Sequence, residues 1–198
     1  MLGITPSQTV GPFYAYCLTP TKYKLHEIFT NDLIVPGLEG EKIRIEGRVL
    51  DGDNAGIPDA MIEIWQADAK GGFAHARGAQ GANIGFKGFG RVEPDNEGRY
   101  HFITIKPGRV KAPEGKLQAP HIDVAVFARG MLKHLVTRIY FGDEESNKDD
   151  PVLTQVPADR RDTLIAKPQG NRGEKVYRFD IRIQEGPEGP PETQFFEF

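Results

Sequence analysis

Hydrophobic and polar residues alternate along several short stretches of this chain, and such a two-residue period is typical of β-strands. The clearest pair of stretches covers residues 121–128 and 134–141, where β-branched and aromatic side chains recur at every second position. Gly130 lies between these stretches and supplies the backbone freedom that a tight turn needs. We therefore predict a central β-hairpin with its turn at this glycine.

The same alternation predicts further strands on both sides of the hairpin. They are expected at residues 42–50, at 60–67, at 91–106 with a hairpin-like turn at 95–98, at 176–184, and in a terminal strand containing Phe196 and Phe198. Helical spacing is limited to two short stretches, residues 22–33 and 157–167. Many short strands with regular turns and little helix favour an all-β fold, namely a single-domain β-sandwich with long loops.

The chain length is that of one domain. The 198 residues are 38% hydrophobic, which is sufficient for one core of ordinary size. We divide the domain into an N-terminal arm at residues 1–40, the sandwich at 41–185 and a C-terminal tail at 186–198. The arm contains valine and several aromatic residues, and the tail ends in QFFEF. Because apolar terminal segments usually dock, we expect both to take part in subunit contacts.

Charge and composition exclude several functional classes. The formal net charge of -3 provides no basic field for nucleic acid or anionic lipid. No stretch reaches the roughly 18 apolar residues that span a bilayer, and MLGITPSQTV has neither the basic start nor the apolar run of a signal peptide. We expect a cytoplasmic protein whose partners are small molecules or proteins. Cys17, the single cysteine, is expected to be a partly buried and inert thiol.

His121 and Asp123 are the best candidates for chemistry that local spacing offers. Two residues apart on a strand, they point to the same face and could share a metal, a proton or a substrate. A bound metal commonly needs three or four ligands, and no second histidine-rich motif supports this pair. The alternative interpretation is a His–Asp hydrogen bond at an interface. No nucleophile elbow or phosphate-binding loop is present.

A set of ordered motifs then suggests a family. The motifs are DGDNAGIPDAMIEIWQADAKGGF, FGRVEPDNEGRYHFITIKPG, APHIDVAVFARG and YRFDIRI. Together they resemble those of the intradiol ring-cleavage dioxygenases, over nearly the whole chain. TPSQTVGPFY, FARG and TLIAK are more narrowly similar to the group within that family that acts on protocatechuate. The resemblance implies a β-sandwich and non-haem Fe(III) held by two tyrosinates and two histidines.

The resemblance also locates the four ligand positions in this chain. The first tyrosine position is occupied by Phe73, and the second by Arg109 or Val110. The two histidine positions are occupied by His121 and Asp123. Only one of the four expected ligands is therefore present, which implies that this chain holds no metal and has no catalytic residue of its own. An arginine that the family places shortly before the first histidine, to stabilise the reacting substrate, is replaced by Gln118 or a neighbour.

In the protocatechuate group the enzyme is built from two homologous chains, alpha and beta, and the iron is on beta. This sequence resembles the alpha type. The resemblance implies a hetero-oligomer with the iron-bearing beta subunit that opens protocatechuate with O2 to 3-carboxy-cis,cis-muconate in aromatic catabolism. It further implies that Thr9, Pro12 and Arg129 line the beta chain's substrate pocket. The alternative is that Arg129 is a solvated turn residue and Thr9 a tether of the arm.

Two other functions stay open on the sequence. One is a non-catalytic β-sandwich that serves as a binding or scaffold module without an enzyme partner. The other is a self-sufficient intradiol dioxygenase with atypical iron ligands around His121 and Asp123.

Overall fold

The computed structural model describes residues 17–74, 85–112, 115–170, 173, 175–187 and 189–197. Its strands are β1 (Lys42–Leu50), β2 (Met61–Gln66), β3 (Phe89–Val92), β4 (Arg99–Ile105), β5 (His121–Phe127), β6 (Leu135–Phe141), β7 (Ile165–Gln169), β8 (Lys175–Arg178) and β9 (Ile181–Arg182). Four short 3-10 helices lie between or before them, namely η1 (Pro20–Tyr23), η2 (Glu145–Asp149), η3 (Leu153–Gln155) and η4 (Arg161–Leu164). No helix within these ranges is long and apolar enough to cross a membrane.

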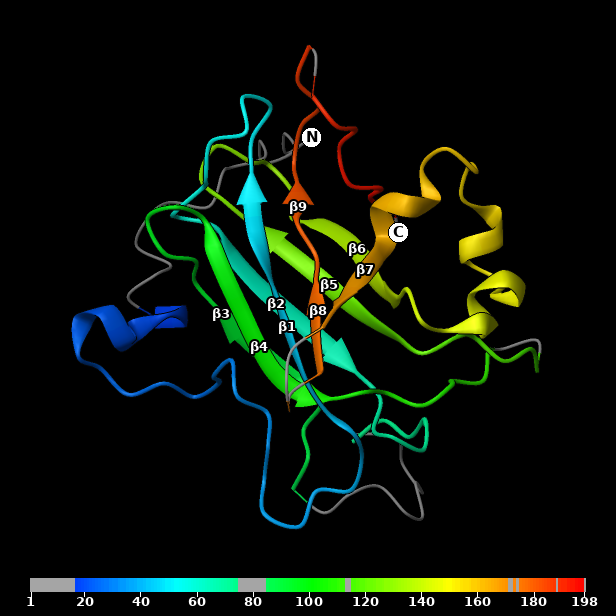
Figure 1. The fold of residues 1–198 in the computed structure, drawn as a ribbon. Coiled ribbons are helices and arrows are strands. Elements are labelled where there is room, and N and C mark those ends of the chain that lie inside the picture. Colours follow the sequence, from blue (N-terminus) through cyan, green and yellow to red (C-terminus); the bar gives the residue numbers. More distant parts are fainter. Residues whose placement is uncertain are drawn as a thin grey trace, which may run out of the picture.

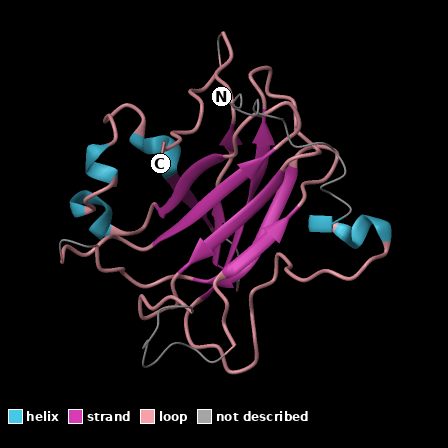
Figure 2. Ribbon diagram, turned by 180° about the vertical axis from the view of Figure 1, so that it is seen from behind, coloured by secondary structure: helices cyan, strands magenta, loops and turns pink. Residues whose placement is uncertain are grey.

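The strands form two layers that face each other (Figures 1 and 2). The strand order is β3-β2-β5-β6-β7-β8-β1-β4, with β9 beside β1. β7 joins the layers, because it pairs in parallel with β6 and antiparallel with β8. The first layer is therefore β3-β2-β5-β6 and the second is β8-β1-β4. This architecture confirms the predicted all-β sandwich and the central hairpin, in which β5 and β6 pair antiparallel.

Alternating apolar residues fill the space between the layers. On β5, Ile122, Val124 and Val126 are buried, and they pack in one cluster with side chains of the opposite layer such as Ile43 and Phe102. Fully burying an aliphatic side chain of this size contributes about 1.5–3 kcal/mol. The two-residue period is thus set by which face meets the core.

The predicted strand at 176–184 is broken into β8 and β9. Between them the main chain of Phe179 approaches β1 so closely that a Cβ at Gly47 would lie 1.7 Å from the Phe179 carbonyl oxygen. That carbonyl accepts a hydrogen bond from the Tyr100 hydroxyl at 2.7 Å, and Asp180 accepts one from the Arg48 main chain at 2.9 Å. The bend therefore anchors the end of the second layer, which a single straight strand would not do.

The turn at 95–98 is present, but the strands beside it do not form a hairpin. The Asp95 main-chain N–H donates to the Arg99 carbonyl at 2.9 Å, which closes the turn. β3 pairs with β2, whereas β4 pairs with β1, so the chain crosses here from one layer to the other.

Both predicted helices are wrong over most of their length. In 22–33, η1 ends at Tyr23, and Leu25 and Ile28 are 57% and 78% exposed. The carbonyls of Thr30 and Asn31 accept hydrogen bonds from the edges of β3 and β4, which hold this segment extended. In 157–167, η4 is followed directly by β7, because the sandwich needs a strand between β6 and β8.

Two smaller expectations are also corrected. Cys17 is exposed rather than partly buried. The tail forms an isolated bridge between Phe196 and Val136 within its described part, not a terminal strand, while Phe198 lies outside the described residues. Thr9 and Pro12 of the arm lie outside them as well.

A charged cluster ties the two layers together at one end. Asp143, which follows β6, accepts a hydrogen bond from the Tyr177 hydroxyl at 2.9 Å and contacts Lys175 at 2.9 Å and Lys106 at 3.2 Å. Burial alone would raise the pKa of Asp143, but the bonds from Lys175, Tyr177 and Lys106 hold it down at about 2. The ionised carboxylate is thus stabilised in the folded state.

We predict that Asp143→Asn lowers stability at neutral pH and that this effect fades in acid. An unfolded aspartate titrates near 3.9, so the contribution of Asp143 is complete above about pH 4 and is lost as the pH falls toward 2. The expected loss at pH 7 is about 1–2 kcal/mol, reduced for partial exposure. Urea unfolding at pH 7 and pH 3 measures it, with Asp53→Asn in an exposed turn as control. An equal loss at both pH values would contradict the prediction.

Candidate functional site

Two of the four positions expected to match iron ligands, His121 and Asp123, lie together at one corner of the first layer, on its outer face. His121 and Asp123 are on β5, where the register places Tyr140 opposite His121 and Arg138 opposite Asp123. The side chains on this face point away from the core that Ile122 and Val124 enter. The predicted shared face of His121 and Asp123 is therefore confirmed, and two β6 side chains complete it.

Arg138 occupies the centre of this corner. Its Nε lies 2.8 Å from Asp123 Oδ1, and its Nη1 donates to Gln118 Oε1 at 2.7 Å. Nη1 is also 3.4 Å from the Tyr140 hydroxyl oxygen. The Arg138 side chain is only 15% exposed. Asp123 is thus neutralised by a largely buried guanidinium from the neighbouring strand.

His121 is buried and held by the main chain. Its Nδ1 lies 2.7 Å from the Ala119 carbonyl oxygen, which can only accept, so Nδ1 donates. The ring packs against Tyr140 with centroids 5.8 Å apart. Burial lowers the pKa of His121, and the positive charge of Arg138 lowers it further. His121 is therefore a neutral imidazole at pH 7, with its proton on Nδ1.

Asp150 supports this corner from below and is fully buried. It accepts hydrogen bonds from the Tyr140 hydroxyl at 3.0 Å and from the Ala119 main chain at 2.7 Å. The main-chain groups of Val152 and Leu153 donate to it at 2.9 and 2.8 Å. Four donors satisfy the charged carboxylate, so it fixes both the start of β5 and the Tyr140 side chain.

The two positions expected for tyrosinates carry no hydroxyl. Phe73 stacks on Trp65 with ring centroids 6.2 Å apart, and Trp65 is the cross-strand neighbour of Asp123. The Val110 carbonyl accepts from the Gln118 main chain at 2.8 Å, and the Gln118 side chain accepts from Arg138. Both positions are thus close to the corner, linked to it through one intervening side chain or peptide.

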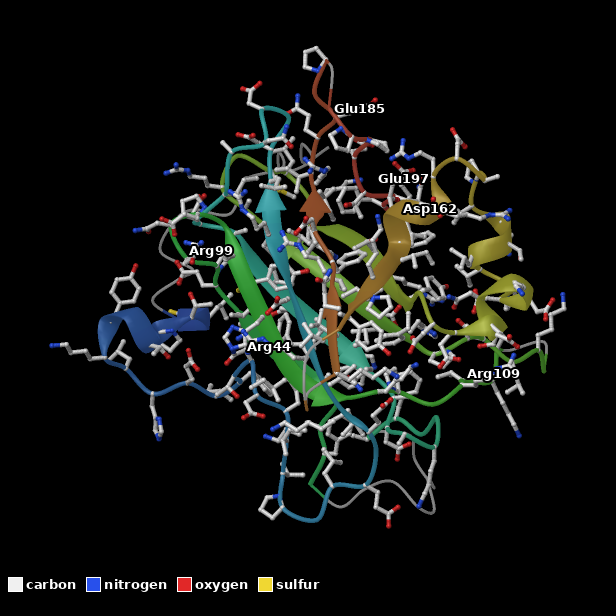
Figure 3. All side chains as sticks on the ribbon, in the orientation of Figure 1. Arg44, Arg99, Arg109, Asp162, Glu185 and Glu197 are labelled. Carbon is white, nitrogen blue, oxygen red and sulfur yellow. The ribbon has the colours of Figure 1, made fainter. Side chains whose placement is uncertain are left out.

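Arg109, the other residue considered for the second tyrosine position, belongs to the loop before β5. Its Nη2 donates to the Leu117 carbonyl at 3.0 Å, so it closes that loop. Figure 3 shows Arg109 at the side of the molecule opposite Arg44 and Arg99. Arg109 is therefore a loop-closing residue in this arrangement.

The residues present do not fit a four-ligand ferric site. A phenyl ring and an isopropyl group have no atom that can bind a metal, and Asp123 is already paired with a cation. Within the described residues, no group of three or more His, Cys, Asp or Glu side chains is placed to hold a metal ion. The chain is therefore judged unfit for a ferric site because the side chains of Phe73 and Val110 have no donor atom.

A shallow depression of about 160 Å³ lies beside Asp123 on the same outer face. Its lining is mainly apolar and includes Trp65, Phe89, Ala125 and Val136. Next to it, Glu63 is ion-paired with Arg91 at 2.5 Å, and both side chains are largely buried. This face therefore presents apolar and aromatic side chains between two internally neutralised ion pairs.

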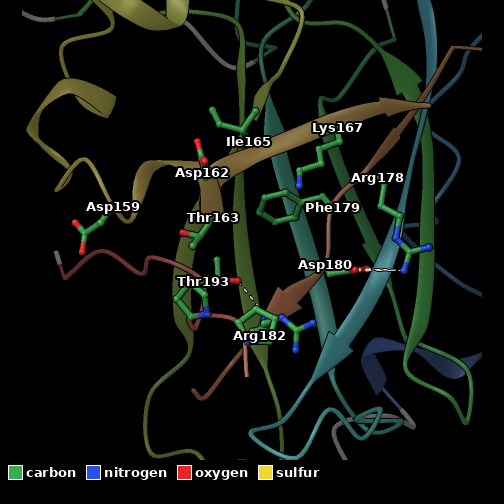
Figure 4. Close-up of a pocket in the computed structure, with 12 residues that line it drawn as sticks. Asp159, Asp162, Thr163, Ile165, Lys167, Arg178, Phe179, Asp180, Arg182 and Thr193 are labelled. Carbon is green, nitrogen blue, oxygen red and sulfur yellow. Dashed lines mark hydrogen bonds and ion pairs between the residues drawn. The ribbon is translucent and has the colours of Figure 1, made fainter. Parts of the chain in front are cut away.

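A second cleft, of about 420 Å³, lies between β7, β8, β9 and the tail (Figure 4). It carries side chains of both charges, and Arg178 is paired with Asp180 at 3.0 Å. The Arg182 main chain donates to the Thr193 hydroxyl at 2.9 Å, which holds the tail against β9. These contacts describe a solvated charge network and no reactive group.

Arg129 is far from the corner, at the opposite end of β5. It lies in the hairpin turn, its side chain is 71% exposed, and its Nε is 2.9 Å from Asp59 Oδ2. Asp59 precedes β2, and the β2–β5 register, in which Met61 faces Phe127, places it across from Arg129. Arg129 is thus an exposed turn residue, but one whose guanidinium is tied to a neighbouring strand.

Arg138, Tyr140 and Asp150 escaped the sequence-based site prediction. Arg138 and Tyr140 are two residues apart on the return strand of the hairpin, so the sequence alone could predict that they share a face. Their pairing with Asp123 and His121 depended on the exact register. Asp150 gave no local signal for this site, because the two partners that link it to the corner, Tyr140 and Ala119, are 10 and 31 residues away.

Comparison with known proteins gives the family context. A family model described as Dioxygenase matches residues 10–185. The protocatechuate 3,4-dioxygenase alpha chain of Burkholderia cepacia is 46% identical over 199 residues, covering 98% of this chain and 96% of that one. The protocatechuate 3,4-dioxygenase beta chain of the same organism is 34% identical over 155 residues, covering 73% of this chain and 65% of that one.

Solved structures agree on the architecture. The dioxygenase domain of a dioxygenase carbohydrate-binding protein fusion from Streptomyces sp. SirexAA-E has a TM-score of 0.61 with this chain. It is 21% identical, and the match covers 91% of this chain and 98% of that one. At this identity the likeness concerns the fold, and it supports the two-layered sandwich described above.

We predict that this chain, purified on its own, binds no stoichiometric iron and lacks the visible colour of a ferric tyrosinate. The physical reason is that Phe73 and Val110 supply no ligand and that Arg138 already neutralises Asp123. Iron analysis and a visible absorption spectrum measure both properties. A coloured chain with one iron per polypeptide would contradict the prediction.

Proposed function

Because the chain belongs to the intradiol dioxygenase family, we propose that it is the alpha subunit of a protocatechuate 3,4-dioxygenase. In this proposal it assembles with a homologous, iron-bearing beta subunit. The complex cleaves protocatechuate with O2 to 3-carboxy-cis,cis-muconate. The ring bond between the two hydroxylated carbons breaks, and both atoms of O2 enter the product.

The observation that supports this proposal most directly is the extent of the likeness to an alpha chain. It covers almost the whole of both chains, whereas the likeness to a beta chain is weaker and shorter. The ligand positions point in the same direction, since two of the four are occupied by Phe73 and Val110.

The family depends on non-haem ferric iron, and we assign that iron to the beta subunit. A self-sufficient enzyme would need Asp123 and His121 as ligands, but Asp123 is paired with Arg138 and the other two positions offer no donor atom. No step of ring cleavage is therefore assigned to side chains of this corner.

What this chain contributes, in the proposal, is a wall of the partner's substrate pocket. A groove of about 1010 Å³ lies between the hairpin end and the C-terminal tail. Phe127 and His134 stack at 5.1 Å across the hairpin, and Leu132 in its turn is 64% exposed. An exposed apolar side chain on such a groove is suited to a subunit contact.

Arg129 extends from the same hairpin end and is the cation that we propose faces the substrate carboxylate. A guanidinium has five N–H donors, so it can keep Asp59 on one edge and still bind a second carboxylate. Thr9 and Pro12, which we propose as a hydroxyl and a rigid wall of the same pocket, lie outside the described residues.

Co-expression with an iron-bearing homologue tests the proposed function. We expect the two chains to co-purify and the complex to consume O2 when protocatechuate is added. This chain alone is expected to consume no O2. Oxygen uptake and iron content are the measurements. Failure of the chains to associate, or an iron-loaded complex that leaves protocatechuate unchanged, would contradict the proposal and favour a binding or scaffold module.

In the assembled complex, we predict that Arg129→Ala leaves iron content unchanged and raises KM for protocatechuate roughly tenfold, because a charge-assisted contact with the carboxylate is lost. Steady-state oxygen uptake measures this. Lys70→Ala is the matched control, since Lys70 is an exposed cation paired with Glu39 beyond the other end of β2. Unaltered kinetics in the iron-loaded Arg129 variant would limit this chain to scaffolding.

A further inference from the structure

We propose that the guanidinium of Arg138 takes the place of a metal ion in the corner formed by His121, Asp123, Phe73 and Val110. This inference concerns the chain itself and does not depend on the identity of a partner or substrate. Two of the four expected ligand positions, His121 and Asp123, lie on one face of β5, and the positive charge beside them belongs to a side chain. Arg138 thus prevents a metal from binding at this corner. Removal of its side chain would allow a divalent cation to bind there.

The first argument is geometric, because Arg138 connects two of the segments that carry the expected ligand positions. Its Nε reaches Asp123 on β5, and its Nη1 reaches Gln118 in the preceding loop. The Gln118 main chain is in turn bonded to the Val110 carbonyl. One guanidinium therefore joins β6, β5 and the loop that starts at the second tyrosine position.

The second argument is electrostatic. The Asp123 side chain is 36% exposed, and its carboxylate lies 2.8 Å from the Arg138 guanidinium. A metal at this corner would need the same carboxylate as a ligand. A buried or half-buried carboxylate requires a counter-charge, and Arg138 supplies it without any exchangeable ion. A metal cation entering the corner would face an adjacent fixed positive charge and find Asp123 already paired with it.

The third argument is that His121 remains a competent ligand. Its Nδ1 donates to the Ala119 carbonyl, which is the arrangement that orients a histidine to bind a metal through Nε2. His121 and Asp123 share one face of β5, so the two ligands stay together when the arginine is removed.

The chemical class of the cation follows from these two ligands. An imidazole nitrogen and a carboxylate oxygen suit Ni2+, Co2+ or Zn2+, with water at the open positions. A ferric ion would require the oxygen donors that Phe73 and Val110 lack. The opened site is therefore expected to bind a divalent cation reversibly and without the colour of a tyrosinate.

The test compares thermal unfolding of the full-length chain with and without about 1 mM Ni2+, a concentration chosen for a weak site with two ligands. We expect Arg138→Ala to lower Tm by about 4–8 °C, because Asp123 loses its partner. Ni2+ should restore part of this loss in Arg138→Ala and leave the wild-type Tm unchanged. The double variants R138A/D123N and R138A/H121Q should lose the response to Ni2+.

Arg91→Ala is the matched control. It removes an ion pair of similar burial, with Glu63 on the neighbouring strand, and within the described residues the Glu63 carboxylate is bonded to Arg91 and to no histidine. We expect a similar fall in Tm without a response to Ni2+. If Arg138→Ala does not fold, Arg138→Gln keeps a side chain that can bond to Gln118 and carries the same comparison.

A folded Arg138 variant that does not respond to Ni2+ would overturn the proposal. So would a wild-type chain that Ni2+ stabilises as much as the variant, because the corner would then be open despite the arginine. An equal response in R138A and R138A/H121Q would place the cation elsewhere and would also overturn it.

Discussion

The antiparallel register between β5 and β6 is the constraint on which the rest of this structure depends. It sends Ile122 and Val124 into the space between the layers, and it sets Asp123 opposite Arg138 on the other face. A shift by one residue would exchange the two faces, exposing the core and burying the charges. The core and the polar corner are thus two consequences of one pairing, which explains why a strand so central to the fold also carries the best candidates for chemistry.

The sequence was sufficient to predict those features that the alternation of apolar and polar residues determines. The central hairpin, β1, β2 and the sandwich class follow from a two-residue period that the core imposes directly. The period does not show where a strand bends or which layer it joins. The break after Arg178 depends on the close approach of Phe179 to Gly47, more than 130 positions away in the chain. The helix expected at 22–33 is absent because the carbonyls of Thr30 and Asn31 accept hydrogen bonds from the edges of β3 and β4.

The sequence predicted which segments carry the candidate site, but not which side chains interact there. The motifs located Phe73, Val110, His121 and Asp123, and the structure brings their segments to one corner. The arginine at its centre came from the facing strand, where its role depends on register rather than on a motif. Arg129, in contrast, was singled out by the motif FARG, and only the structure shows that Asp59 holds it.

These features describe a chain that keeps the architecture of its family while, in our proposal, the Arg138 side chain takes the place of a metal beside His121 and Asp123. Its proposed contribution lies at the other end of β5, where the hairpin turn, the groove and Arg129 face outward. The two ends are joined by one rigid strand pair. The Arg138–Asp123 ion pair ties β6 to β5, and the same two strands carry the hairpin end that we propose to face the partner's substrate.

The location of iron in the assembled complex tests this account most directly. Diffraction from a crystal of the complex, recorded just above the iron absorption edge, shows each iron atom as an anomalous peak. The account predicts one peak in the partner chain and none between His121 and Asp123, with Arg138 in contact with Asp123 as described. A peak at that corner, with the arginine displaced, would contradict it.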